Sequence, residues 1–218
     1  MNIDISKMAD NCRYIGKGNN LIRSSLVSNL SKEATEYLLK SNITNFIDLR
    51  STEEVLKLPC ILSDKFNYKN LPLCNNGRLP HNGSEIAEFY YKVAEEKIRV
   101  QRVLKAIANT DSGTVIFCRS GKDRTGIISA LLLSLGGYSD EYISIDYTLS
   151  QKNLKKSIDA YLLLHPEYER EALSPCKMHI MGFLDKVRSN YTDVKNYCRE
   201  IGLTEQDILS LRNKVGSP

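Results

Sequence analysis

The spacing of apolar residues along the chain predicts strands and helices in alternation. Two short runs, residues 43–49 (ITNFIDL) and 114–117 (TVIF), consist mainly of β-branched and aromatic residues and are typical of buried strands. Elsewhere, apolar side chains recur three and four positions apart, as they do on one face of a helix. Helices are therefore predicted over residues 31–42, 84–109, 125–135, 139–150, 153–163, 177–189, 191–201 and 205–214, and one more begins at residue 52.

Polar residues that usually cap helices stand at three of these helix starts. Ser31 precedes the first helix and Thr204 precedes the last. Ser51 and Glu54 have the spacing of a capping box, in which each side chain accepts a hydrogen bond from the backbone N–H of the other residue. Between residues 57 and 83, three prolines and two glycines indicate mostly loop, with one further strand expected within residues 66–73.

Strands that alternate with helices in the first two thirds of the chain predict an α/β fold. The expected architecture is a mainly parallel central sheet flanked by helices on both faces, followed by a helical C-terminal third. Residues 1–218 are expected to form a single domain, since this length suffices for one hydrophobic core.

Two polar clusters stand directly after the predicted strands. Asp48 and Arg50 follow the first strand, and a loop beginning at Cys118 follows the second. Ligands of parallel sheets bind beyond the carboxyl ends of the strands, so this coincidence is the first indication of a site. Asp48 and Arg50 are candidates for contacting a substrate, and the alternative is that they only tie the strand end to its neighbours.

Composition and charge argue against several classes of protein but do not identify a partner. Lys and Arg outnumber Asp and Glu by only 30 to 26, and no nucleic-acid partner is expected. No apolar run approaches the roughly 18 residues of a membrane span, and the start MNIDISKMADNC lacks the order of a secretory signal. The six cysteines lack Cys-x-x-Cys spacing, so we expect free thiols, no metal site and a cytoplasmic location. The sequence leaves the oligomeric state open.

The loop at residues 118–124 has the features of an anion-binding site. It connects a predicted strand to a helix N-terminus, where free backbone N–H groups and the helix dipole favour negative charge. Gly121 allows close approach of the backbone, and Arg124 supplies a planar fork suited to two oxygens of a phosphate. Arg119 and Lys122 add further positive charge. A nucleotide-binding loop is excluded, because Asp123 follows Gly-Lys where Ser or Thr is required.

Cys118 stands at the start of this loop and is the candidate nucleophile. Loop amides, the helix N-terminus and a guanidinium group all favour its thiolate, which is then directed at a bound phosphoryl group. Thr125 can donate its hydroxyl to the sulfur when the sulfur leaves. A general acid must protonate the departing oxygen, and Asp123 is the first candidate for this role, with Asp48 as the second.

The stretch CRSGKDRTG, residues 118–126, resembles the signature of the cysteine-dependent tyrosine phosphatase superfamily. The pair Lys122-Asp123 is similar to the atypical bacterial branch, whose loop reads Cys-x-x-Gly-Lys-Asp-Arg-Thr-Gly. Residues 14–54, the stretch DYTLS (146–150) and the final Gly-Leu-Thr helix also resemble that branch. The resemblance implies a phosphocysteine mechanism without cofactor or metal. Arg119, Ser120, Gly121 and Lys122 are then expected to bind the substrate, a phosphotyrosine protein, with phosphoserine, phosphothreonine or a phosphoinositide as further possibilities.

The sequence departs from the superfamily pattern at two points. The residue before the cysteine is usually His, which helps to hold the loop, and here it is Phe117. The chain also has no Trp, and thus no Trp-Pro-Asp motif that would supply the acid from a separate loop. One alternative is therefore a non-catalytic phosphate-binding protein with a phosphatase scaffold. A sulfur- or arsenate-handling enzyme fits less well, since the run from Lys122 to Thr125 has no evident purpose there.

Three aromatic residues, at positions 89–91, and two further cysteines lie outside the loop at residues 118–124. Phe89, Tyr90 and Tyr91 lie in a predicted helix and are assigned to its core or surface rather than to a substrate wall. Cys60 or Cys74 is a candidate for protecting an oxidised Cys118 as a disulfide.

Overall fold

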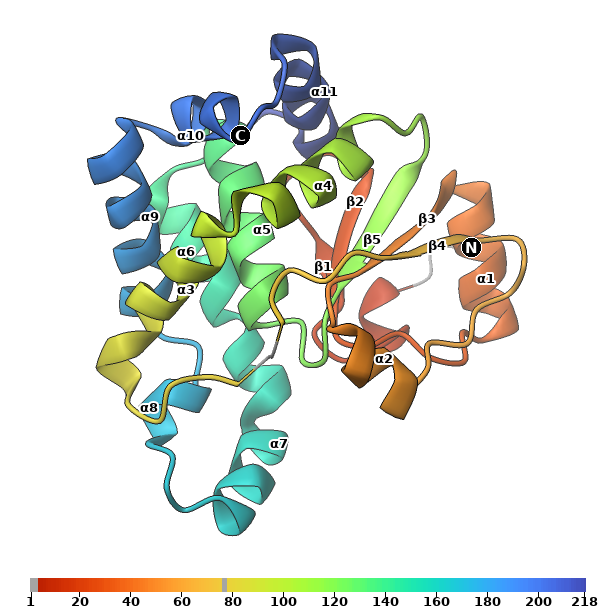
Figure 1. Cartoon of the computed structure of the whole chain (residues 1–218). Coiled ribbons are helices and arrows are strands. Elements are labelled where there is room, and N and C mark those ends of the chain that lie inside the picture. Colours follow the sequence, from red (N-terminus) through yellow and green to blue (C-terminus); the bar gives the residue numbers. More distant parts are fainter. Residues whose placement is uncertain (1–3, 76–77) are drawn as a thin grey trace.

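A computed structural model describes residues 4–75 and 78–218 of the chain (Figure 1). Within these residues, five strands form one sheet in the order β1-β2-β5-β3-β4. β1 is antiparallel to β2, whereas the pairs β2–β5, β5–β3 and β3–β4 are parallel. The predicted, mainly parallel sheet is thereby confirmed. The strands are Arg13–Tyr14 (β1), Leu21–Ser24 (β2), Ile43–Asp48 (β3), Asn67–Asn70 (β4) and Gly113–Phe117 (β5).

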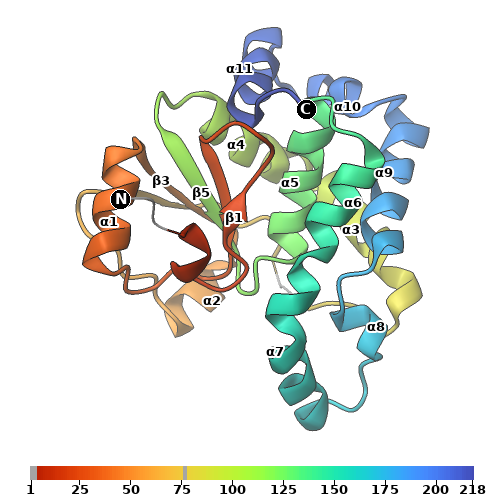
Figure 2. The same ribbon diagram turned by 180° about the vertical axis from the view of Figure 1, so that it is seen from behind.

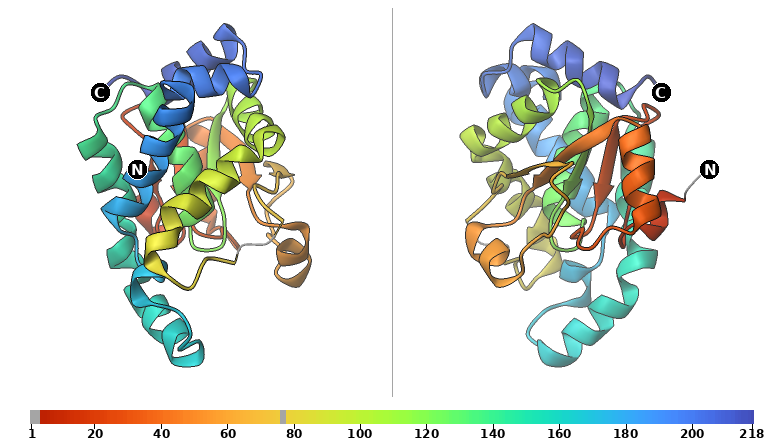
Figure 3. Two further views of the ribbon diagram at one scale, coloured as in Figure 1. Left: turned by 60° about the vertical axis from the view of Figure 1, so that its left-hand side comes forward. Right: turned by 90° about the vertical axis from the view of Figure 1, so that its right-hand side faces the viewer.

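Helices lie on both faces of the sheet, as predicted, but they are distributed unequally. The helix α1 (Lys32–Lys40) covers one face, whereas α3 (Ile86–Glu95), α4 (Lys97–Ala108) and α5 (Asp123–Leu135) lie on the other (Figures 1 and 2). The helical C-terminal third packs outside α5 (Figure 3). The remaining helices are α2 (Thr52–Lys57), α6 (Asp140–Thr148), α7 (Ser150–Leu164), α8 (Arg170–Leu173), α9 (Lys177–Tyr191), α10 (Val194–Glu200) and α11 (Glu205–Val215), with 3-10 turns at Ile5–Lys7 and Gly83–Glu85.

The predicted helix caps are present. The Ser31 side chain accepts a hydrogen bond from Ala34 N and begins α1. Ser51 and Glu54 form the predicted capping box at the start of α2. Thr204 caps α11 and forms a second capping box with Asp207.

The single helix predicted over residues 84–109 is wrong. The chain forms a 3-10 turn and then two helices, α3 and α4, that meet at Glu96, whose ψ angle of 56° interrupts the helical path. Apolar periodicity continues through this break, because each helix still buries a face. α3 packs on α9 and α4 packs on α11, which lie in different directions from the sheet.

The sequence pattern also missed β1, β2 and α8. β2 consists of LIRS, and its Arg23 is completely buried, so the strand lacks the apolar signal that identifies buried strands. A buried arginine requires a counter-charge from elsewhere in the fold. That partner is distant in sequence, which explains why local reasoning could not find the strand.

The carboxyl ends of the parallel strands form one edge of the sheet. Ser24 of β2 and Asp48 of β3 are both in register with Phe117 of β5, and Asn70 of β4 is in register with Asp48. Cys118 and the loop that follows it extend beyond this edge, between α2 and α7 (Figure 1). None of the helices in residues 4–75 and 78–218 has the length and apolar character needed to cross a bilayer.

Phe117 and Cys118 belong to opposite faces of the sheet. Phe117 is completely buried in the apolar cluster beneath α1, where its ring lies 6.5 Å from that of Phe46. Cys118 belongs to the larger cluster around α5, as does Ile116. Successive side chains of a strand point to opposite faces, so Phe117 faces away from the side on which Cys118 lies.

We predict that Phe117→Ala lowers the free energy of unfolding by about 3 to 5 kcal/mol, because it leaves a cavity between the sheet and α1. Urea denaturation followed by circular dichroism measures this change. Phe117→Leu, the matched control, largely refills the space and should cost less than about 1.5 kcal/mol. An alanine variant as stable as the wild type would contradict the packing role of Phe117.

Candidate active site

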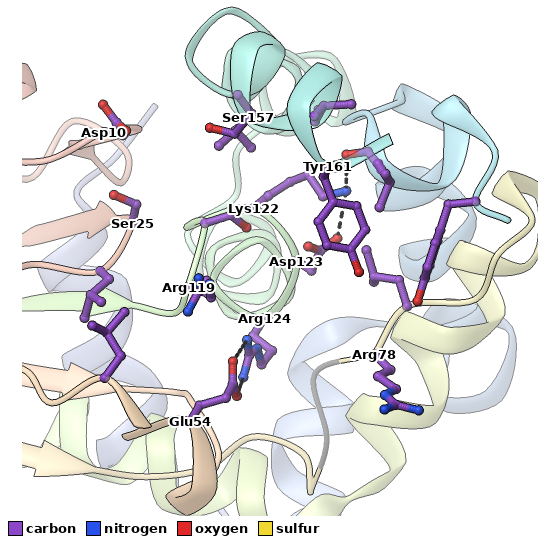
Figure 4. A pocket seen from close by; sticks show the side chains of 18 residues that line it. Asp10, Ser25, Glu54, Arg78, Arg119, Lys122, Asp123, Arg124, Ser157 and Tyr161 are labelled. Atoms are coloured by element: carbon purple, nitrogen blue, oxygen red, sulfur yellow. Dashed lines mark hydrogen bonds and ion pairs between the residues drawn. The ribbon is translucent and has the colours of Figure 1, made fainter. Parts of the chain in front are cut away.

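The loop after β5 forms the floor of a cavity of about 790 Å³ (Figure 4). Loop residues Arg119, Ser120, Lys122, Asp123 and Arg124 line it. α5 begins at Asp123, two residues before the predicted start, so Asp123 and Arg124 occupy the first turn of the helix. The other walls come from the segment after β2, from α2, from residues 78–79 and from the segment α7–α8.

Three consecutive backbone carbonyls of the loop, those of residues 119–121, accept hydrogen bonds from donors outside it. The donors to the carbonyls of residues 119, 120 and 121 are, in turn, Leu26 N (3.1 Å), Asn11 Nδ2 (3.1 Å) and Arg23 Nη2 (2.9 Å). Within the described residues, none of the backbone N–H groups of residues 119–124 donates to a protein acceptor. The loop therefore keeps a set of unused N–H donors at a helix N-terminus, which is the arrangement that binds anions.

Gly121 is required by its backbone conformation and by its surroundings. Its φ angle of +68° lies in the left-handed region that favours glycine. A Cβ atom at this position would also lie 2.4 Å from the carbonyl oxygen of Ser24. The loop thus packs directly against the end of β2, whereas the sequence predicted that Gly121 would allow close approach to a bound anion.

A buried ion-pair network holds the donors that surround the loop. Asp146 of α6 pairs with Arg23 and, at 2.8 Å, with Arg13. Arg13 in turn donates to the side chain of Asn11 at 2.5 Å. Burial raises the pKa of Asp146, but the charges of Arg23 and Arg13 outweigh it, so the pKa lies below its ordinary value. Asp146 belongs to the stretch DYTLS, whose resemblance to the bacterial branch does not by itself reveal this ion pair.

Arg124 is held by Glu54 in a two-pronged ion pair. Arg124 Nη1 lies 2.5 Å from Glu54 Oε2 and Nη2 lies 2.9 Å from Oε1. Burial opposes the charge of Arg124, but hydrogen bonds from its guanidinium to Glu54, and the charges of Cys118 and Glu54, raise its pKa above the ordinary value. The capping box of α2 fixes Glu54 itself, since Ser51 N donates to Oε2 at 2.9 Å. The sequence revealed the cap but not this second use of Glu54.

Cys118 and Thr125 lie beneath the cavity rather than on its wall. Cys118 is 1% exposed and directly precedes the lining residues Arg119 and Ser120. Thr125 is completely buried, and its Oγ1 has no hydrogen-bond partner in the part of the chain that the structure describes. A buried hydroxyl without a partner is unusual and remains available to a group at the site.

Asp123 and Lys122 are bound to each other and to the surrounding helices. Lys122 Nζ lies 3.1 Å from Asp123 Oδ1 and 2.6 Å from the carbonyl oxygen of Leu173 in α8. Asp123 Oδ1 also accepts a hydrogen bond from Tyr90 of α3 at 2.5 Å. Lys122 is 2% exposed and therefore serves first to join the loop to α8 (Figure 4). The sequence assigned Tyr90 to the core or the surface of its helix and did not reveal this contact with Asp123.

Two arginines of the cavity have no carboxylate partner among the described residues. Arg119 projects from the loop, and Arg78 lies on another wall (Figure 4). Both are exposed. Apolar and aromatic side chains face them from α7 and the segment before α8, namely Leu154, Ile158, Tyr161 and Tyr168.

The structure places Asp48 and Arg50 outside the cavity lining. Both are completely buried and pair at 2.6 Å, and Tyr68 donates to Asp48 at 2.9 Å. Arg50 also donates to the carbonyl oxygen of Leu58 at 2.7 Å. These contacts tie β3 to β4 and to the segment after α2, which is the structural alternative considered from the sequence. Asp48 is completely buried and does not line the cavity, so the structure gives no support to its role as the second candidate acid.

No group of three or more His, Cys, Asp or Glu side chains in residues 4–75 and 78–218 is arranged to hold a metal ion. The charged groups that line the cavity are the side chains of Arg78, Arg119, Lys122 and Arg124 and the carboxyl groups of Asp10, Glu54 and Asp123, of which Glu54 is paired with Arg124. They are suited to a tetrahedral oxyanion and to proton transfer.

Comparison with known proteins gives a family match over nearly the whole chain. The model of a family described as the tyrosine phosphatase family matches residues 7–216. A tyrosine-protein phosphatase from Nostoc commune is 26% identical, and the match covers 89% of this chain and 74% of that protein.

Comparison with solved structures also gives matches, two of which are reported with their scores. The core catalytic domain of the PP-IP phosphatase SIW14 from S. cerevisiae, in complex with citrate, has 15% identity and a TM-score of 0.44, covering 87% of this chain and 94% of that one. A variant of TpbA from P. aeruginosa in complex with pTyr has 12% identity and a TM-score of 0.37, covering 99% of this chain and 94% of that one.

We predict that Asp146→Asn lowers the free energy of unfolding by about 3 to 5 kcal/mol at pH 7, because it leaves buried Arg23 without a counter-charge. The lowered pKa of Asp146 means that its stabilisation is present above the ordinary carboxyl pKa of about 4 and is lost as the pH falls further. Urea unfolding at several pH values between about 7 and 3 should therefore show the wild type and the variant converging in acid.

Asp140→Asn is the matched control in the same helix. Asp140 pairs with Arg188 at the surface, where water screens the charges, so this change should cost less than about 1 kcal/mol. A difference between wild type and Asp146→Asn that stays constant down to pH of about 3 would show that the ion pair is not its source.

Proposed function

The chain belongs to this tyrosine phosphatase family, and we propose that it hydrolyses phosphomonoesters through a covalent phosphocysteine at Cys118. The observation that carries the proposal is the orientation of the loop backbone. Cys118 and Arg124 flank this loop. The carbonyls of residues 119–121 accept hydrogen bonds from outside it, and the N–H groups of residues 119–124 donate to no protein acceptor among the described residues. These donors match the three non-bridging oxygens of a phosphoryl group.

In the first step, the Cys118 thiolate attacks phosphorus. The sulfur–phosphorus bond forms while the bond from phosphorus to the ester oxygen breaks, and Asp123 transfers a proton to that departing oxygen. The non-bridging oxygens move into a plane in the transition state. The loop N–H groups and the guanidinium of Arg124, fixed by Glu54, bind this geometry more tightly than the ground state.

In the second step, water attacks phosphorus and releases inorganic phosphate. Asp123, now a carboxylate, accepts a proton from the water, and the sulfur–phosphorus bond breaks. In this proposal Thr125, whose buried hydroxyl has no hydrogen-bond partner among the described residues, donates that hydroxyl to the departing sulfur. The thiolate of Cys118 is thereby restored. In this scheme Lys122 supports Asp123 and α8, while Arg119 and Ser120 contact the substrate at the mouth of the loop.

The alternative, a non-catalytic phosphate-binding protein, depended on Phe117. The ring of Phe117 packs beneath α1, on the face of the sheet opposite to Cys118. The hydrogen bonds that orient the loop come instead from Asn11, Arg23 and Leu26. A histidine before the cysteine is therefore not required to hold this loop, and the geometry favours the enzyme.

Cys118→Ser tests the proposal directly. Exchange of the thiolate for a hydroxyl should reduce hydrolysis of p-nitrophenyl phosphate at least about 1,000-fold, since the nucleophile is lost while the cradle remains. Binding of inorganic tungstate, measured by calorimetry, should persist. Cys198→Ser, a change at a buried cysteine outside the site, is the matched control. Wild-type turnover in Cys118→Ser would exclude the phosphocysteine.

The cavity walls favour a phosphotyrosine residue as the substrate. Tyr161, Tyr168, Leu154 and Ile158 provide apolar surface for an aromatic ring above the loop. Phosphoserine, phosphothreonine and phosphoinositides are the further substrates to consider, since the unpaired Arg78 and Arg119 also suit an additional anionic group.

We expect kcat/KM to be at least about 10-fold higher for a phosphotyrosyl peptide than for the matched phosphoseryl peptide, because only the former places a ring on this wall. Phosphate release from both peptides and from a panel of phosphoinositides, measured side by side with chelator present, provides the comparison. An equal or higher kcat/KM for a phosphoinositide would contradict the preference for phosphotyrosine that we infer from the apolar wall of the cavity.

A further inference from the structure

Two buried tyrosines lie directly beneath the carboxyl group of Asp123. Tyr90 comes from α3 and Tyr147 from α6, and neither is more than 1% exposed. Tyr90 Oη lies 2.5 Å from Asp123 Oδ1 and 2.6 Å from Tyr147 Oη. The three polar groups thus form a chain that runs from the protein interior to the first turn of α5.

The direction of the hydrogen bonds in this chain follows from the number of protons. Tyr90 has one hydroxyl proton and donates it to Asp123, so Tyr147 must donate to Tyr90. Within the described residues, Tyr147 Oη has no other hydrogen-bond partner. Both tyrosine protons therefore point, in sequence, toward Asp123.

The hydrogen-bonded series from Tyr147 through Tyr90 to Asp123 also distinguishes the two oxygens of the Asp123 carboxyl group. Oδ1 receives both the Tyr90 hydroxyl and, at 3.1 Å, the ammonium of Lys122. Oδ2 has no protein partner in the part of the chain that the structure describes, and Asp123 lines the cavity. A proton held by Asp123 is consequently held on Oδ2, the oxygen that is free to face a leaving group.

We propose that Tyr90, itself oriented by Tyr147, is a positioning residue for proton transfer by Asp123. This inference rests on the proposed function, in which Asp123 is the general acid. The bond from Tyr90 fixes the rotation of the carboxyl group and keeps Oδ2 toward the cavity. As the proton leaves Oδ2 for the ester oxygen, negative charge grows on the carboxylate and the hydrogen bond from Tyr90 strengthens.

The surroundings of the two tyrosines indicate that their hydroxyl groups have a role beyond packing. The Tyr90 ring packs at 6.4 Å from that of Phe183, in an apolar region where phenylalanine would also fit. A buried hydroxyl needs a partner, and this pair reaches no acceptor other than Asp123 in residues 4–75 and 78–218. Nearby His179 of α9 is uncharged at neutral pH, because burial and the charge of Lys122 lower its pKa to about 4.

Tyr90→Phe tests the inference through the leaving group. p-Nitrophenolate departs with little need of a proton, whereas the oxygen of phenyl phosphate needs one in the transition state. We expect kcat of Tyr90→Phe to fall about 10-fold with phenyl phosphate and less than about 2-fold with p-nitrophenyl phosphate, with KM unchanged for both. Tyr91→Phe, the same change at the next residue of α3, should alter neither value.

A second background separates positioning from structure. In Asp123→Asn, where no proton can be donated, adding Tyr90→Phe should cause no further loss with phenyl phosphate. An equal loss on both substrates, or a further loss in the Asp123→Asn background, would overturn the inference. Thermal unfolding of each variant checks the fold. If Tyr90→Phe does not fold, Tyr147→Phe removes the next donor and should give the same pattern at about 2- to 3-fold.

The outcomes also distinguish this inference from the function on which it rests. Wild-type turnover that does not depend on Cys118 would overturn the proposed function and the role of Tyr90 with it. Cys118-dependent turnover with no leaving-group effect in Asp123→Asn would remove the acid role of Asp123. If turnover depends on Cys118 and Asp123→Asn shows a leaving-group effect, but Tyr90→Phe affects the two substrates equally, only the role of Tyr90 is wrong.

Discussion

Satisfaction of the backbone carbonyls in the loop at residues 118–124 is the constraint on which the site depends. A peptide unit that directs its N–H group toward the cavity must direct its carbonyl away from it, where a donor has to be available. Leu26, Asn11 and Arg23 supply those donors. Arg13 and Asp146 then hold Asn11 and Arg23 in place, so that a network spread over β1, β2 and α6 helps to determine the orientation of the carbonyls of residues 120 and 121.

The positive charges of the loop are largely balanced by the protein itself. Glu54 compensates Arg124, and Asp123 together with α8 carbonyls occupies Lys122. In the proposed mechanism, the attraction for an oxyanion therefore comes mainly from oriented N–H groups at a helix N-terminus and from the guanidinium of Arg124, rather than from an excess of charge. A set of fixed N–H dipoles selects an anion by its shape, because dipoles act at short range. In the proposed mechanism, exposed Arg119 and Arg78 are then available to contact the part of the substrate that surrounds the phosphate.

Sequence patterns predicted those parts of the candidate site that depend only on residues close together in the chain. The strand TVIF, the spacing from Cys118 to Arg124 and the capping box at Ser51 and Glu54 all depend on neighbouring residues, and each is present in the structure. The partners that complete the site are 33 to 133 positions apart in sequence, as in Tyr90 with Asp123 and Arg13 with Asp146, and no periodicity reveals them. Buried Arg23 even concealed a strand, since a charged residue argues against burial unless its counter-charge is known. Asp48 and Arg50 illustrate the opposite case: their position at a strand end was predicted, but only the fold shows that they bind each other.

The distance in sequence between the loop and its donors has a consequence for folding. Arg23 lies 98 positions before Gly121, and Asn11 lies 109 before Ser120, so these contacts close long stretches of chain and form late compared with the hydrogen bonds inside a helix. A chain still emerging from the ribosome can complete the donors long before it has made the loop, and it reaches Asp146 later still. The loop around Cys118 therefore acquires all of its supporting contacts only after Asp146 has been synthesised, and a chain that ends before that residue lacks the complete network.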